Sequence, residues 1–160
     1  MKSFQLFQNR NYWVLEILNY SNKTIDEGIS GKLKMEKLSA EVREGLIKQG
    51  NENPWRLIRD FRGPTEPGLS RLMISFQKLG LVEIEQIKSQ GVKYLITEKG
   101  IKVKNSLDKF FSKINPIEIQ IKEIIEEEVL KKWIKKTGNE IVESSEIIQN
   151  MKKENLGKRL

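Results

Sequence analysis

The sequence of 160 residues contains no cysteine and no histidine. These absences exclude disulfide bonds, thiolate chemistry, zinc sites of the usual kind and acid–base catalysis by histidine. Long apolar runs are also missing, since no stretch approaches the roughly 20 residues that a transmembrane helix needs. The N-terminus has neither a long apolar segment nor a small-residue cleavage site. We therefore expect a cytoplasmic protein with no membrane contact, no cofactor and no bound metal.

One group of acidic residues is compatible with catalysis. Glu83 and Glu85 lie on one face of a predicted strand, and together with Asp60 and Lys88 they resemble a site for Mg²⁺. The hairpin interpretation uses the same glutamates as its exposed face, and no lysine follows at the spacing found in nucleases. We therefore do not expect an enzyme.

Basic residues exceed acidic ones, 29 to 22, and the net charge is +7. Residues 1–30 carry three basic and three acidic groups, residues 31–105 carry fifteen and nine, and residues 106–160 carry eleven and ten. A basic surface attracts a polyanion by steering and counterion release, whatever the base sequence. Lysine-rich composition also simply favours solubility, so the charge identifies a segment of interest and not a function.

The most informative segment spans residues 68–97. The apolar residues of its first part recur at helical spacing: Leu69, Leu72, Met73, Phe76 and Leu79. They predict a helix with one buried side, and Gly80 predicts its end. Residues 81–87 then alternate as a half-buried strand does, and Gln90-Gly91 predicts a turn before a second strand over residues 92–97. A helix followed directly by a hairpin is typical of a winged helix, whose helix fits the DNA major groove.

Two motifs in this segment carry a resemblance to a known family. The first is Leu69-Ser70-Arg71-Leu72, followed by Phe76 and by Lys78-Leu79-Gly80-Leu81-Val82-Glu83. The second is Tyr94-Leu95-Ile96-Thr97-Glu98-Lys99-Gly100. At this spacing the pair resembles the recognition helix, the wing and the start of the following helix in MarR- and PadR-like winged-helix regulators, over about residues 55–105. The resemblance implies a mainly α-helical fold with a small β-hairpin wing (α+β), here a winged helix-turn-helix with a C-terminal helical extension.

Apolar periodicity and breaking residues predict the remaining elements. Helices are expected over residues 9–20, from residue 35 to about 50, over 98–114, over 116–136 and over 140–154, with a polar loop over 21–32. A short helix, residues 55–61, is predicted between Asn53-Pro54 and Gly63-Pro64 as the first arm of the helix-turn-helix. Residues 62–67 then form the turn, and Thr65 is the predicted N-cap of the recognition helix.

The break at Asn115-Pro116 predicts a winged-helix DNA-binding domain over residues 1–114 and a helical extension over residues 115–160. An isoleucine stripe along the extension is broader than a coiled-coil seam. It can pack on its own winged helix or against a second copy. Because regulators of this kind are commonly dimers that read palindromic sites, we favour a homodimer. The predicted interface residues are Ile117, Ile121, Ile125, Val129 and Trp133.

The predicted DNA contacts lie on the polar side of the recognition helix and beside it. The resemblance implies that Ser70 and Arg71 face the groove, where arginine can bind guanine O6 and N7 together. Lys88 and Lys93 flank the wing turn and suit a phosphate or a minor groove, although lysines also protect edge strands from aggregation. The predicted set is Arg62, Thr65, Ser70, Arg71, Ser75, Lys78, Lys88 and Lys93.

The function expected from the sequence is sequence-specific binding of double-stranded DNA by a winged helix, in a homodimeric transcription regulator. Two alternatives are a winged-helix module for protein–protein interaction and a non-specific DNA-binding protein associated with a chromosome or plasmid. No motif identifies a small-molecule effector.

Overall fold

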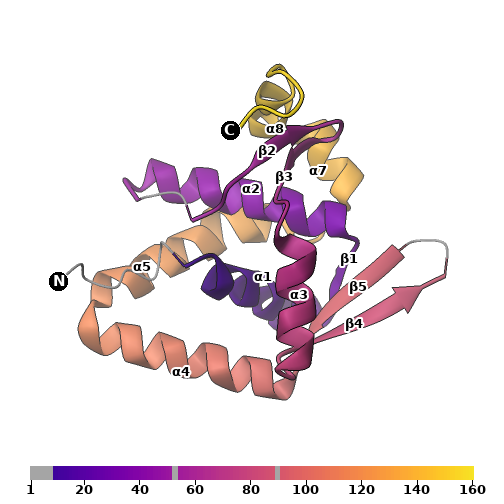
Figure 1. The fold of residues 1–160 in the computed structure, drawn as a ribbon. Coiled ribbons are helices and arrows are strands. Elements are labelled where there is room, and N and C mark those ends of the chain that lie inside the picture. Colours follow the sequence, from indigo (N-terminus) through magenta and orange to yellow (C-terminus); the bar gives the residue numbers. More distant parts are fainter. Residues whose placement is uncertain (1–8, 52–53, 89–90) are drawn as a thin grey trace.

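The computed structural model describes residues 9–51, 54–88 and 91–160 of this mainly helical chain (Figure 1). The elements are α1 (Arg10–Ile25), β1 (Ile29–Ser30), α2 (Lys32–Lys48), β2 (Ile58–Asp60), β3 (Gly63–Thr65), α3 (Leu69–Lys78), β4 (Val82–Ile87), β5 (Gly91–Ile96), α4 (Glu98–Ile114), α5 (Pro116–Ile125), the π-helical turn η2 (Glu126–Leu130), α6 (Lys131–Trp133), α7 (Gly138–Ser144) and α8 (Glu146–Met151). Among these residues, no helix has the length and apolar character needed to cross a membrane. The α+β class expected from the sequence is confirmed.

The larger sheet has three antiparallel strands in the order β1-β5-β4. β4 and β5 form the predicted hairpin, with Val82 opposite Ile96. The short strand β1 falls within the predicted polar loop, and its Ile29 pairs with Tyr94 on β5. A strand of two residues shows no alternation of apolar and polar residues in the sequence. It is therefore recognised only by its pairing with β5.

The core is built around α1. Every residue from Tyr12 to Ser21 is buried, so this helix is covered on all sides. It contacts α2, α4, η2 and β5. The predicted helix over residues 9–20 is therefore confirmed, and it extends to Ile25 because Asp26 adopts a left-handed conformation that ends it.

The prediction of a short helix over residues 55–61 is wrong. Ile58–Asp60 form β2, which pairs with β3 across a turn before Gly63. The other edge of β2 meets the C-terminal segment, where Arg59 N–H donates to the Lys158 carbonyl at 2.9 Å. The guanidinium of Arg59 also donates to the Lys152 carbonyl, at 2.9 Å from Nη2. These partners are remote in sequence, so local pattern could not predict the strand.

The predicted cap of the recognition helix is also wrong. Gly68 occupies the N-cap position of α3 and makes no side-chain cap bond. Thr65 lies in β3, where its hydroxyl donates to Glu36 at 2.8 Å. At the other end, Gly80 has a φ of +75°, which confirms the predicted glycine stop. Leu79 is 58% exposed, so its predicted place in the buried stripe is wrong, because the helix ends at Lys78.

The break at Asn115-Pro116 is confirmed as the junction of α4 and α5. However, the two predicted domains share one core, to which the extension contributes Ile125, Leu130, Trp133, Ile134, Ile141 and Ile148. α5, η2, α7 and α8 all contact α2. The approach is close at Gly45, where an added Cβ would lie 2.8 Å from Ile125 Cδ1.

This packing corrects the argument for a dimer. The prediction that these side chains need a second chain to bury them is wrong for Ile125 and Trp133. Both are buried within their own chain. Ile121 and Val129 are partly buried against the same core. Only Ile117 among the five predicted interface residues is strongly exposed, at 62%.

Candidate nucleic-acid interface

The exposed side of α3 is the centre of the candidate interface. Four apolar residues, Leu69, Leu72, Met73 and Phe76, are buried and fix the helix on the core. Arg71, Ser75 and Lys78 recur at i, i+4 and i+7 on the exposed side, and Ser70 is half-buried beside them. Hydrophobic burial of one side therefore presents the other side of the helix to solvent in a fixed orientation.

The end of α3 is tied to the start of α4. The hydroxyl of Thr97 accepts a hydrogen bond from Gly100 N–H at 3.0 Å and donates to the Gly80 carbonyl at 2.6 Å. The ammonium of Lys99 donates to the Leu79 carbonyl at 2.8 Å. A Cβ on Gly100 would lie 2.2 Å from the Leu81 carbonyl oxygen. These contacts give a physical reason for the Thr97-Glu98-Lys99-Gly100 motif, because they hold α3 and the hairpin in one relative position.

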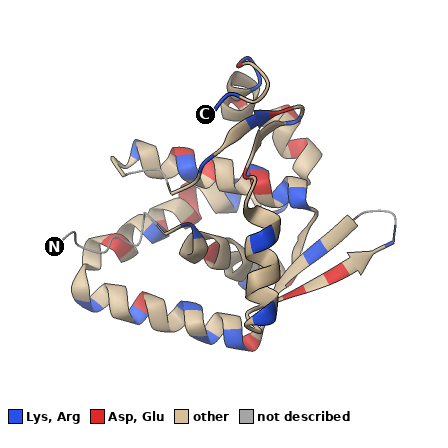
Figure 2. Cartoon of the chain, in the orientation of Figure 1, with Lys and Arg blue, Asp and Glu red and all other residues tan. Residues whose placement is uncertain are grey.

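The β4–β5 hairpin has two faces of different chemistry. Successive strand residues alternate between faces. The face toward α3 carries Ile84, Gln86, Val92 and Tyr94. On the opposite face Glu85 pairs in register with Lys93, and Glu83 lies on the same face. Figure 2 shows basic positions along α3 and acidic positions along β4, so the hairpin is not uniformly basic.

A groove of about 380 Å³ lies between α3 and the hairpin. Its lining residues are Lys32, Ser70, Ile74, Gln77, Ile84, Gln86, Val92 and Tyr94. Among the described residues of this lining, Lys32 alone is charged, and its ammonium lies 3.5 Å from a carboxylate oxygen of Glu36. The described lining is therefore mostly neutral, and it includes both amide groups and apolar side chains.

A second hollow, of about 320 Å³, adjoins the first at Lys32. It lies between the start of α2 and the β2–β3 hairpin, and Arg62 and Thr65 line it. Lys37 also lines it, is buried, and donates to the Pro64 carbonyl at 2.6 Å. Burial lowers the pKa of Lys37 to about 8. The exposed cations at this hollow are Arg62 and Lys32, of which Lys32 lies beside Glu36, whereas the Lys37 ammonium is hydrogen-bonded to the backbone.

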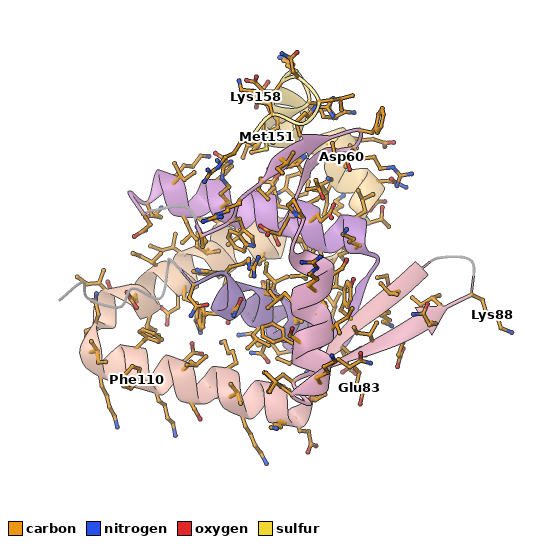
Figure 3. The ribbon with its side chains drawn as sticks, viewed as in Figure 1. Asp60, Glu83, Lys88, Phe110, Met151 and Lys158 are labelled. Atoms are coloured by element: carbon orange, nitrogen blue, oxygen red, sulfur yellow. The ribbon has the colours of Figure 1, made fainter. Side chains whose placement is uncertain are left out.

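The structure brings most of the predicted contact residues to adjoining surfaces. Ser70, Arg71, Ser75 and Lys78 are all on α3, and Arg62 and Thr65 lie at the neighbouring hollow. The Ser75 hydroxyl donates to the Arg71 carbonyl at 3.0 Å and is thus engaged within its own helix. Lys88 extends from the far end of the hairpin (Figure 3), and Lys93 lies on the hairpin face opposite the groove.

Sequence reasoning missed Ile74, Gln77, Gln86 and Lys32 as parts of this surface. The signal for two of them was present, because Ile74 and Gln77 follow Ser70 at i+4 and i+7. Gln86 and Lys32 had no such signal, since only the pairing of β1, β5 and β4 brings them to the groove.

The acidic group considered for Mg²⁺ is not assembled. Glu83 lies near the C-terminal end of α3, whereas Asp60 belongs to the β2–β3 hairpin (Figure 3). Within the described ranges of the chain, no cluster of three or more acidic residues is placed to hold a metal ion.

A buried ionic network lies in the core, away from α3. The ammonium of Lys104 on α4 lies 2.5 Å from Glu16 Oε2 and 2.6 Å from Asp108 Oδ2. The Tyr12 hydroxyl donates to the other Asp108 oxygen at 2.6 Å. Burial, together with the neighbouring Glu126, raises the pKa of Glu16 to about 8. The network joins α1 to α4 and stands apart from the candidate interface.

Comparison with known proteins gives no match: no family model, curated protein or solved structure shows significant similarity to this chain. Arguments about function therefore rest on the geometry and chemistry described above.

Proposed function

We propose that this chain is a winged-helix protein that binds double-stranded DNA in a sequence-specific manner, as a homodimeric transcription regulator in the cytoplasm. Support for the winged helix comes from the order of elements. Two helices separated by the short strand β1 precede α3, which passes directly into the β4–β5 hairpin, and β1 pairs with the second strand of that hairpin. A winged helix is built from these parts in this order.

The observation that carries the DNA proposal is the exposed face of α3. Its ten residues correspond to about 15 Å of helix, which suits a major groove roughly 12 Å wide. Arg71 and Lys78 are exposed on that face, and the groove beside it is neutral. Exposed cations can bind phosphates or guanine, and neutral polar groups can bind base edges. A surface that carries both is therefore suited to DNA.

The β2–β3 hairpin takes the place of a tight turn between α2 and α3. Arg62 is exposed at its turn and lines the hollow that adjoins the groove at Lys32. In this proposal Arg62 contacts a phosphate and extends the footprint beyond α3, because a phosphate contact positions a protein without reading sequence.

The test is selection of bound duplexes from a random pool by the full chain, followed by binding measurements with Arg71→Ala. We expect a defined sequence to emerge, and Arg71→Ala to weaken binding to it by about 1–3 kcal/mol with relaxed preference at one position. Equal loss on selected and unrelated duplexes would make Arg71 a phosphate contact. Equal wild-type affinity for all duplexes would favour the non-specific binder, and no binding at low salt would favour the protein-interaction module.

The homodimer has a separate test. Phe110, Ile114 and Ile117 are exposed apolar side chains near the junction of α4 and α5, and we propose that they form the contact between copies. Ile117→Lys should halve the solution mass without changing the thermal unfolding midpoint. A wild-type chain with the mass of a monomer at binding concentrations would contradict the homodimer and leave DNA binding unaffected.

A further inference from the structure

One apolar side chain on α3 has no role in the core. Ile74 is 47% exposed, whereas the other large apolar residues of this helix are buried. Ile74 follows Ser70 by four residues and precedes Gln77 by three, so the three lie within two turns of the helix. All three line the groove beside the hairpin. Its position, on the side of α3 that carries Arg71 and Lys78, is the one that a DNA base edge would meet.

The lining of the groove does not suit a phosphate. Lys32, the one charged side chain that the structure describes in this lining, already lies beside Glu36. The other polar lining groups include the amides of Gln77 and Gln86, which both donate and accept hydrogen bonds. An apolar contact paired with an amide is the chemistry that reads an A·T pair, because thymine presents its C5-methyl group and adenine presents N6 and N7 in the major groove.

We propose that this groove reads an A·T pair, with Ile74 in contact with the thymine methyl group and Gln77 hydrogen-bonded to adenine. Arg71 lies on the same exposed side of α3 but outside the described lining of the groove, and in this proposal it contacts a neighbouring guanine. The inference rests on the proposed DNA-binding function and adds the base that the groove selects. Ile74 and Gln77 are thereby the residues that determine specificity at that pair.

The experiment removes the methyl group without changing base pairing. Each thymine of the selected duplex is replaced in turn by uracil, and affinities of the full chain are compared. One replacement should weaken wild-type binding by about fourfold, as expected for loss of one buried methyl group at ~0.8 kcal/mol. Ile74→Ala should bind the thymine duplex more weakly than wild type does, and should bind the thymine and uracil duplexes equally. Gln77→Ala should weaken the preference for A·T over G·C at the same pair but keep the thymine-over-uracil preference that Ile74 provides.

Ile47→Ala is the matched control, because Ile47 is 41% exposed on α2 and does not line the groove. It should keep the fourfold thymine preference, and both isoleucine variants should keep the wild-type unfolding midpoint. If Ile74→Ala retains the thymine preference, or if no thymine shows one, the inference is wrong while DNA binding stands. If no duplex binds at low salt, the proposed function fails and this inference fails with it.

Discussion

The hydroxyl of Thr97 lies 2.6 Å from the carbonyl oxygen of Gly80, to which it donates a hydrogen bond. The Thr97 hydroxyl oxygen also accepts a hydrogen bond from Gly100 N–H and so caps α4. One side chain therefore joins the last turn of α3 to the first turn of α4. The position of the exposed α3 face relative to the hairpin depends on this contact, because Gly80 is the residue at which the chain leaves α3.

We predict that Thr97→Val lowers the free energy of unfolding by about 1–2 kcal/mol, the usual cost of losing a helix cap. Valine keeps the shape of threonine but can neither donate to Gly80 nor accept from Gly100. Urea unfolding of the full chain measures the effect, and Thr97→Ser, which keeps the hydroxyl, is the control. Equal stability of the valine and serine variants would show that the hydroxyl contacts contribute little.

Truncation after Asn115 should abolish cooperative folding. The removed residues supply Ile125, Leu130 and Trp133 to the shared core. Losing buried side chains of this size costs about 1.5–3 kcal/mol each, so these three alone remove about 4.5–9 kcal/mol, a large part of the 5–15 kcal/mol by which a domain is usually stable. Circular dichroism during heating should show no sigmoidal transition. A truncated chain that melts cooperatively would restore the division into two independent domains.

The Glu16 carboxyl should make stability depend on pH. Its pKa is raised from 4.5 to about 8 in the folded chain, so between these values the folded state binds more protons than the unfolded state. The contribution of Glu16 to the free energy of unfolding therefore falls as pH rises through that window. We predict that wild-type stability decreases relative to Glu16→Gln from pH 5 to pH 8. Urea unfolding at several pH values measures this difference.

The control for Glu16→Gln is Glu123→Gln, which removes one negative charge from an exposed position on α5. It should lack the pH-dependent difference. A wild-type chain that gains stability relative to Glu16→Gln over the same range would show that Lys104 holds Glu16 fully ionised.

If the chain binds DNA as proposed, the two lysines of the β4–β5 hairpin should differ in their effect on binding. Lys88 is exposed at the end of β4, whereas Lys93 is half-buried and lies opposite Glu85. We predict that Lys88→Ala weakens binding to all sequences and lowers the slope of log affinity against log salt by about one, as for one lost phosphate contact. Lys93→Ala should have a smaller effect on the slope. The reverse order would indicate that the opposite hairpin face meets the DNA.

The sequence predicted well those elements that bury one side only and whose ends are marked by nearby residues. α3, α4 and the hairpin each show their apolar side at a regular spacing, and glycine or proline marks their ends. The strand β2 was missed because its hydrogen-bond partners include Lys158, far along the chain. The buried position of Lys104 was not predicted, since nothing in the sequence indicates that Glu16 receives it in the core.

The candidate site was predictable only in part, for a related reason. Arg71 and Lys78 follow from the helical period alone. The groove beside them depends on which face of the hairpin turns toward α3. Side chains alternate along a strand with a period of two, and this alternation does not say which of the two faces meets α3. Strand pairing fixed Ile84 and Gln86 on the groove side and put Lys93 on the other.

The pairing of β2 with the C-terminal segment also sets an order for folding during synthesis. The backbone N–H of Arg59 donates to the carbonyl of Lys158, which is made 99 residues later. At the usual 5–20 residues per second, a growing chain waits roughly 5–20 s before this partner exists. During that interval the edge of β2 is unpaired, and such an edge invites pairing with other chains. The segment that leads into α3 is therefore among the last parts of a newly made chain to become fixed.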